Sequence, residues 1–133
     1  MTSFKSWDKG QQPFQVKGGV ISSKQSKPMD IRNYIRADRL YTRSDIRLKS
    51  DICDLNKDDL DKLNKLVPKS YKFKNDNKKH FGFIAQDLEK QFPHLVSTDN
   101  EGMKSVNYLE IIPLLLFKIN DLERKLDEIK NNK

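Results

Sequence analysis

The sequence predicts an α+β fold, with a small antiparallel sheet packed with short helices and a C-terminal helix that carries a coiled-coil seam. Three observations lead to this prediction. Short alternating segments are separated by turn signals, amphipathic helical stretches lie between them, and a heptad pattern of apolar residues occupies the last 25 residues. The chain of 133 residues is long enough for one compact domain and a tail.

The composition of the N-terminal part predicts an arm and not a folded domain. Residues 1–29 are rich in Gly, Ser, Gln, Lys and Pro and have no sustained periodicity, which is typical of a flexible or partner-ordered segment. Val20-Ile21, after two glycines, predicts a short strand. The apolar spacing of residues 30–42 fits either a short helix or an interrupted strand, and the sequence does not decide between them.

The middle of the chain predicts alternating helices and hairpins. Asp54 to Leu66 has leucines near helical spacing, acids at its start and a proline beyond its end, so a helix is expected. Ser70–Lys74 and His80–Ile84 flank a polar turn and predict a hairpin. Ala85–Gln91 predicts a helix closed by Phe92-Pro93. Val96 to Val106 contains a strong turn signal, Asp99 to Gly102, between two short strands.

Apolar residues of this region predict the core. Tyr71 and Phe73 are expected on the buried side of their strand, Cys53 is expected to be a small buried residue, and Gly82 is expected to permit a close backbone approach. The two histidines are expected in packing or rim positions. The predicted core consists of Phe83, Ile84, Leu88, Phe92, Leu95 and Val96.

The strongest periodic signal lies at the C-terminus. Apolar residues recur at spacings of 3, 4, 3, 4 and 3, which is a heptad seam surrounded by charged residues. Pro113 is tolerated only near a first turn, so the oligomerising helix is placed at residues 108–130. An amphipathic helix packed on its own domain is the alternative, but the far end has only a narrow apolar stripe that needs a partner helix. The predicted interface consists of Ile112, Leu115, Ile119, Leu122, Leu126 and Ile129.

Composition and charge exclude several functions. Residues 1–43 carry nine Lys/Arg and three Asp, a net charge of +6, whereas residues 44–133 are nearly neutral at +1. This distribution argues against nucleic-acid binding as the main function, and any such binding is assigned to the arm. One cysteine and two histidines predict no metal site, no cofactor and no internal disulfide. The longest apolar run is too short for a bilayer, and without a signal sequence we expect synthesis in a cytoplasm.

Three separated stretches together resemble one known family. Residues 44–52, SDIRLKSDI, resemble its S-D-x-R-L-K-x-D-I opening. Residues 82–89, GFIAQDLE, followed by FPHLV at 92–96, are similar to its G-F-I-A-Q-E-V-E and F-P-x-L-V segments, and KSVNY at 104–108 is similar to K-S-V-x-Y. The family is the intramolecular chaperone domain, also classed as a self-processing peptidase, of phage endosialidases and tail spikes.

The resemblance implies a homotrimer that holds three chains in register while an upstream or separate fibre or spike client folds, and that then cuts itself away. It implies a chaperone domain at residues 44–133, with its globular part at 44–107, after a basic arm at 1–43. The coiled coil would then be trimeric. The resemblance places the protein in the cytoplasm of the producing or host cell during assembly, or on the virion.

The resemblance also assigns the candidate chemistry. Ser44 is the nucleophile and Lys49 its base, in a single-turnover serine peptidase that cleaves between Arg43 and Ser44. A serine hydroxyl needs a neighbour to take its proton, and lysine does so only as the neutral amine, which burial or nearby positive charge favours. Arg47 supplies such a charge, and Asp45 is expected to orient the loop. The alternative is a non-cleaving trimerisation module that displays its basic arm to a partner.

Overall fold

The computed structural model describes residues 14–23 and 28–132. The chain divides into two compact units, residues 1–49 and residues 50–133, and each is described by itself below. The flexible character expected for residues 1–13 and 24–27 lies outside the described residues.

The smaller unit contains a β-hairpin and a short turn of helix. Strands β1 (Phe14–Lys17) and β2 (Val20–Ser23) pair antiparallel. Gly18 and Gly19 connect them with φ values of 57° and 75°, a conformation that glycine adopts without steric cost. The strand predicted at Val20-Ile21 is confirmed, whereas its partner β1 was not predicted. Residues 30–42 form neither the helix nor the strand that their spacing predicted.

The larger unit begins with helix α1 (Lys57–Leu63), which is shorter than the predicted 54–66. Asn56 fixes its start, because its side chain accepts from the backbone N–H groups of Asp58 and Asp59 while Asp59 bonds back to the Asn56 N–H. Residues 54–55 therefore lie before the capping residue and outside the helix. Leu60 is the buried residue of α1.

Both predicted hairpins are present, but they remain separate two-stranded ladders and do not join into one sheet. Strand β3 (Lys69–Tyr71) pairs antiparallel with β4 (His80–Gly82), and β5 (Val96–Thr98) pairs antiparallel with β6 (Lys104–Val106). Asp99 shapes the β5–β6 turn by accepting from the N–H groups of Glu101 and Met103. The α+β class is confirmed, as small antiparallel hairpins with helices.

The core lies between α2 (Ala85–Gln91), the 3₁₀ turn η3 (Pro93–Leu95) and the start of α3 (Ile111–Asn131). Leu88 is completely buried, and Phe83 and Val96 are partly buried against the cluster. The predicted helix at 85–91 is confirmed. The buried cluster consists of Leu88, Phe92, Leu95, Ile111 and Leu114.

Three burial predictions were wrong. Phe73 is exposed because β3 ends at Tyr71, so its ring lies in the hairpin loop, edge-on to His80. Ile84 is 42% exposed, since it caps the start of α2 and is not part of a strand. Cys53 is exposed in the irregular segment before α1.

Gly82 permits the close approach that was predicted. A Cβ atom at this position would lie 2.3 Å from the hydroxyl oxygen of Tyr108. That hydroxyl oxygen accepts a hydrogen bond from the Phe83 backbone N–H at 3.0 Å. The glycine therefore lets the segment before α3 pack against the end of β4.

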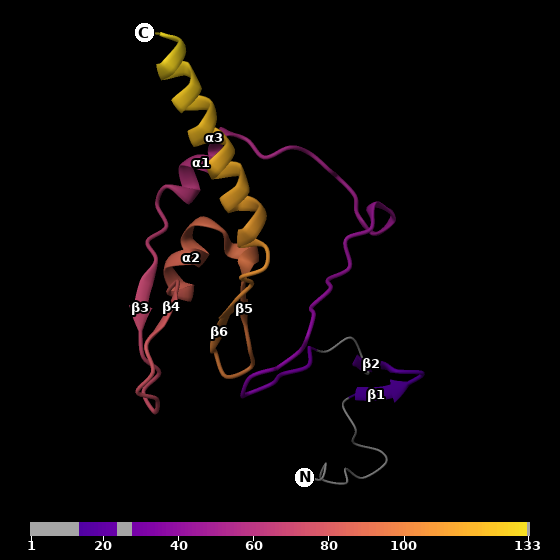
Figure 1. Cartoon of the computed structure of the whole chain (residues 1–133). Coiled ribbons are helices and arrows are strands. Elements are labelled where there is room, and N and C mark those ends of the chain that lie inside the picture. Colours follow the sequence, from indigo (N-terminus) through magenta and orange to yellow (C-terminus); the bar gives the residue numbers. More distant parts are fainter. Residues whose placement is uncertain (1–13, 24–27, 133) are drawn as a thin grey trace. The chain divides into compact units, whose positions relative to one another are not determined.

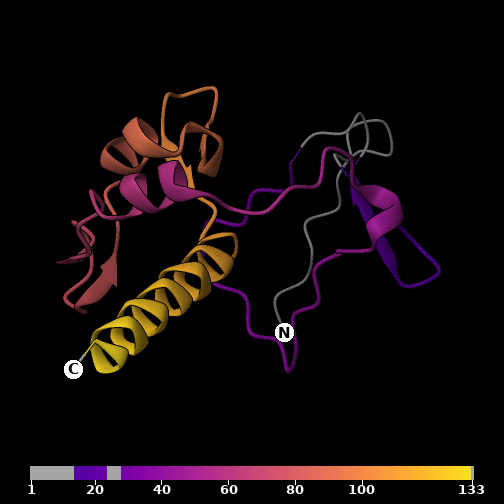
Figure 2. The same cartoon turned by 90° about the horizontal axis from the view of Figure 1, so that it is seen from above.

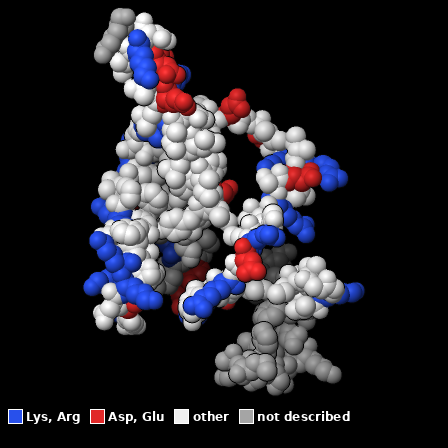
Figure 3. All heavy atoms as spheres, in the orientation of Figure 1, with Lys and Arg blue, Asp and Glu red and all other residues white. Residues whose placement is uncertain are grey.

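Helix α3 has one covered side and one exposed side. Ile111 and Leu114 are buried in the core, and Lys118 donates from Nζ to Asn64 Oδ1 at 2.7 Å. Pro113 lies in the first turn, as expected. The C-terminal turns extend beyond the rest of the larger unit (Figures 1 and 2). In Figure 3 a broad uncharged surface covers the N-terminal half of this helix, and acidic and basic side chains alternate on its last turns.

Candidate functional site

The predicted nucleophile and base lie at a single turn of the chain. The 3₁₀ helix η2 (Ile46–Leu48) is closed by backbone bonds from the Leu48 N–H to Asp45 O at 3.0 Å and from the Lys49 N–H to Ile46 O at 3.1 Å. These i to i+3 bonds reverse the chain direction. Lys49, the residue that ends the turn, thereby returns toward Ser44, five positions earlier.

Ser44 and Lys49 are in direct contact. Lys49 Nζ lies 2.6 Å from Ser44 Oγ, within the range required between a nucleophile and its general base. As the charged ammonium, the lysine donates to the hydroxyl oxygen. As the neutral amine it can instead accept the hydroxyl proton across the same distance. Both residues are exposed in the single chain.

Asp45 stabilises this turn through Arg47. Its Oδ1 accepts from the Arg47 backbone N–H at 2.9 Å and from Arg47 Nε at 3.0 Å, and its Oδ2 accepts from Nη2 at 3.1 Å. The guanidinium contacts, and then the backbone bond, hold the pKa of the Asp45 carboxyl below its usual value. Asp45 in turn raises the pKa of Arg47.

The pairing of Asp45 with Arg47 was not predicted from the sequence. Arg47 was considered for its effect on Lys49, but its guanidinium is paired with the Asp45 carboxylate at the start of the same turn. The spacing of two residues between an acid and an arginine at the start of a 3₁₀ turn is the signal that could have indicated the pair. Its consequence is a turn held by both backbone and side-chain bonds.

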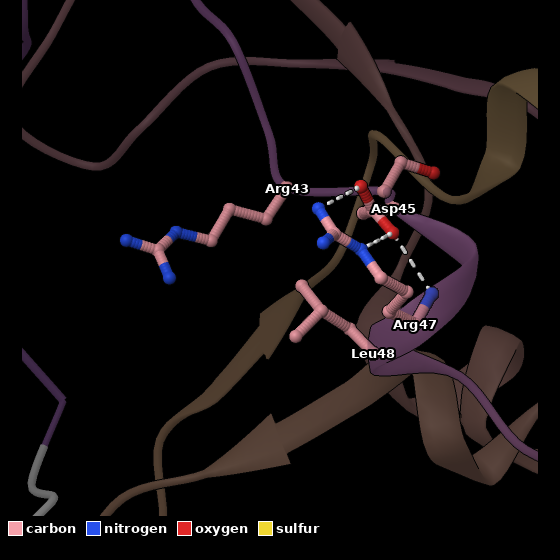
Figure 4. A pocket seen from close by; sticks show the side chains of 5 residues that line it. Arg43, Asp45, Arg47 and Leu48 are labelled. Atoms are coloured by element: carbon pink, nitrogen blue, oxygen red, sulfur yellow. Dashed lines mark hydrogen bonds and ion pairs between the residues drawn. The ribbon is translucent and has the colours of Figure 1, made fainter.

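A surface pocket of about 440 Å³ lies at this turn. Figure 4 shows Arg43, the residue before the predicted cleavage point, pointing away from the Asp45–Arg47 pair. The Arg43 carbonyl carbon is bonded to the Ser44 nitrogen, so attack on it by Ser44 Oγ would close a five-membered ring. The pocket is lined by Arg43, Ser44, Asp45, Arg47 and Leu48.

The predicted interface residues share one side of α3 and are exposed. Their exposed fractions lie between 50% and 62%, in contrast to 7% for neighbouring Leu114. Apolar side chains in such a continuous stripe are typical of a surface that binds another helix. The stripe consists of Ile112, Leu115, Ile119, Leu122, Leu126 and Ile129. Among the residues that the structure describes, no helix is long and apolar enough to cross a membrane.

Comparison with known proteins identifies the class. The family model described as "chaperone of endosialidase" matches residues 44–97, and the match begins at Ser44. The chain therefore contains an intramolecular chaperone domain of the phage fibre and spike type.

Individual relatives agree with this class. The chain is similar to the long tail fibre protein Gp37 of Enterobacteria phage M1 and to that of Enterobacteria phage Ox2. Each is 32% identical over 100 residues, and the matched region covers 68% of this chain. The chain spans 40% of the length of these relatives.

Proposed function

We propose that this chain is a trimerising chaperone that assists assembly of a tail-fibre or spike protein and then releases itself by cutting the Arg43–Ser44 bond. The family match supports the chaperone role, and the tail-fibre relatives support the kind of client. The observation that carries the chemical part is the 2.6 Å contact between Lys49 Nζ and Ser44 Oγ.

The proposed cleavage needs no group beyond the chain and water. Ser44 Oγ attacks the carbonyl carbon of Arg43, and its proton passes to the neutral Lys49 amine. The carbon–nitrogen bond then breaks, Lys49 returns the proton to the Ser44 nitrogen, and an ester joins Arg43 to Oγ. Water hydrolyses this ester. The products are a carboxylate at Arg43 and a free amine at Ser44.

Assembly supplies the environment that the reaction requires. An exposed lysine in water is held in its charged form, which cannot accept a proton. Association of three chains would remove water from the turn and favour the neutral amine. Cleavage would then follow correct assembly, so the chaperone would leave after its client had reached the right register.

The test is the intact mass of the freshly purified chain beside its Ser44→Ala variant, together with the native mass of each. We expect wild-type products that end at Arg43 and begin at Ser44, and an uncleaved Ser44→Ala chain that is still trimeric. Ser44→Ala removes one oxygen atom from an exposed side chain, so it should not affect folding. Intact wild-type chains in a stable trimer would exclude autoproteolysis, and monomers would exclude the assembly role.

A second candidate is a non-cleaving trimerisation module that displays its basic arm. The +6 charge of residues 1–43 favours it, because three arms would present about +18 to a single partner. Binding of an anionic partner by these arms would weaken steeply as salt increases. Under this alternative Ser44→Ala changes neither the mass pattern nor the oligomeric state.

A further inference from the structure

The residues that flank the apolar stripe of α3, here called the seam, change in chemistry along the helix. In heptad notation the seam positions 112, 119 and 126 are a, and 115, 122 and 129 are d. The flanking g positions are then occupied by an isoleucine and two lysines, and the e positions by a leucine, a glutamate and a lysine. These residues are Ile111, Lys118 and Lys125 at g, and Leu116, Glu123 and Lys130 at e.

Parallel helices bring each g residue opposite the e residue five positions later in the neighbouring helix. This rule pairs Lys118 with Glu123, which attract each other, and Lys125 with Lys130, which repel each other. We propose that, within the trimer of the proposed function, Lys118 of each helix is paired to Glu123 of the next parallel helix. The contact between Lys125 and Lys130 weakens the C-terminal end of the same bundle.

Two observations support the attractive pair. The half-buried Lys118 is held by Asn64, whose side-chain oxygen lies 2.7 Å from Nζ, so its side chain loses less freedom on association. Within the described part of the chain, Glu123 forms no ion pair, so its carboxylate is free for another helix. The positioned ammonium group of Lys118 in one copy can therefore pair with the free carboxylate of Glu123 in another copy.

The repulsive contact is partly offset within each helix. Asp121, whose side chain is only 11% exposed, lies 3.0 Å through Oδ2 from Lys125 Nζ. This i,i+4 pair keeps an opposite charge beside Lys125 when Lys130 of the neighbouring helix approaches. The association is therefore strongest where the helix leaves the globular part and weakest at its C-terminal turns.

This inference rests on the proposed trimer, so the experiment uses the uncleaved Ser44→Ala chain and measures its association by sedimentation equilibrium. Glu123→Lys should weaken association roughly tenfold to a hundredfold, because three attractive contacts become repulsive. Asp127→Lys is the matched control: it changes the charge by the same amount on the same helix, but at the outer b position. The double variant Lys118→Glu/Glu123→Lys should regain most of the loss.

Lys130→Glu tests the opposite end and should tighten association, since Lys125 then faces a carboxylate. All these differences should shrink between about 50 mM and about 500 mM salt, because the flanking charges are solvated. A monomeric parent chain would refute the proposed trimer itself. A trimeric parent in which Glu123→Lys behaves like Asp127→Lys, or in which the double variant recovers nothing, would refute the pairing and leave the trimer standing.

Discussion

The two apolar sides of α3 differ in what the chain supplies to cover them. One side places Ile111 and Leu114 at 4% and 7% exposure against α2 and η3. The other side leaves its six seam residues at least half exposed, although they are equally apolar. Leu114 and Leu115 are neighbours in the sequence and lie on opposite sides of this division.

In the proposed trimer, this difference separates the side of α3 that is buried when one chain folds from the side that is buried only against other copies. The covered side belongs to a core that the larger unit builds from its own residues, whereas the seam gains the free energy of burial only on association. The turn that holds the proposed nucleophile and base resembles the seam in this respect, because Ser44 and Lys49 are exposed in the single chain. The described residues 15–22 and 28–49 likewise contain no buried side chain.

The largest expected effect comes from a charge in the middle of the seam. Leu122→Asp would bring three carboxylates together in a closed apolar bundle, where neither hydration nor a partner charge is available. We expect association to weaken by at least about a hundredfold. Because Leu122 is 52% exposed in the single chain, the fold of the larger unit should survive. Native mass spectrometry measures the first effect and circular dichroism the second.

The same variant tests the link between assembly and cleavage. If association completes the environment of Lys49, the dissociated Leu122→Asp chain should remain uncut. Cleavage by the monomer at the wild-type rate would show that the turn is active without assembly.

The neighbouring residues Leu114 and Leu115 allow the two sides of α3 to be compared by the same substitution. Leu114→Ala should lower the free energy of unfolding of the larger unit by about 2–5 kcal/mol at any protein concentration, because it leaves a cavity in the core. Leu115→Ala should leave the monomer nearly as stable and should lower the thermal midpoint only where trimers form. Denaturation at several protein concentrations distinguishes the two variants. If both variants lowered stability equally at every protein concentration, the two sides of α3 would not differ in their dependence on association.

Periodicity in the sequence was enough to predict most of the helices and hairpins. The Ala85–Gln91 helix, the two hairpins and the C-terminal helix follow from local spacing and turn residues, which act over a few positions. The exact ends of the helices and strands depend on side-chain hydrogen bonds that the spacing of apolar residues does not reveal. The Asn56 capping box makes α1 begin at Lys57, after the predicted start at residue 54. The early end of β3 left Phe73 in a loop and exposed.

The candidate site was predicted by resemblance and not by spacing. A serine five residues before a lysine is common on protein surfaces, so spacing alone does not identify a nucleophile. The 2.6 Å contact depends on the η2 turn, and that turn depends on the Asp45 side chain bonding to Arg47. Such an arrangement of several bonds within one turn cannot be read from residue types one at a time.

The smallest predicted effect concerns Asp121, at the junction of the two sides of α3. Its contacts with Lys125, and secondly with Arg124, hold its pKa below the usual carboxyl range. Because the pKa is lower in the folded state, the ionised Asp121 carboxylate stabilises the helix at pH values above the pKa of the unfolded chain. This contribution disappears as the pH falls through the pKa of the folded state. Protonation would also remove the charge that offsets Lys125 beside Lys130.

The measurement is the thermal midpoint of the Ser44→Ala chain and of the same chain with Asp121→Asn, between about pH 6 and about pH 3. Because Arg124 also contacts Glu128, and other carboxyls titrate in this range, the signal is the difference between the two chains. We expect Asp121→Asn to lower the midpoint by about 1–3 °C near pH 6, and this difference to shrink as the pH falls below the ordinary carboxyl range. A difference that persists at low pH would mean that Asp121 acts through packing and not through its charge.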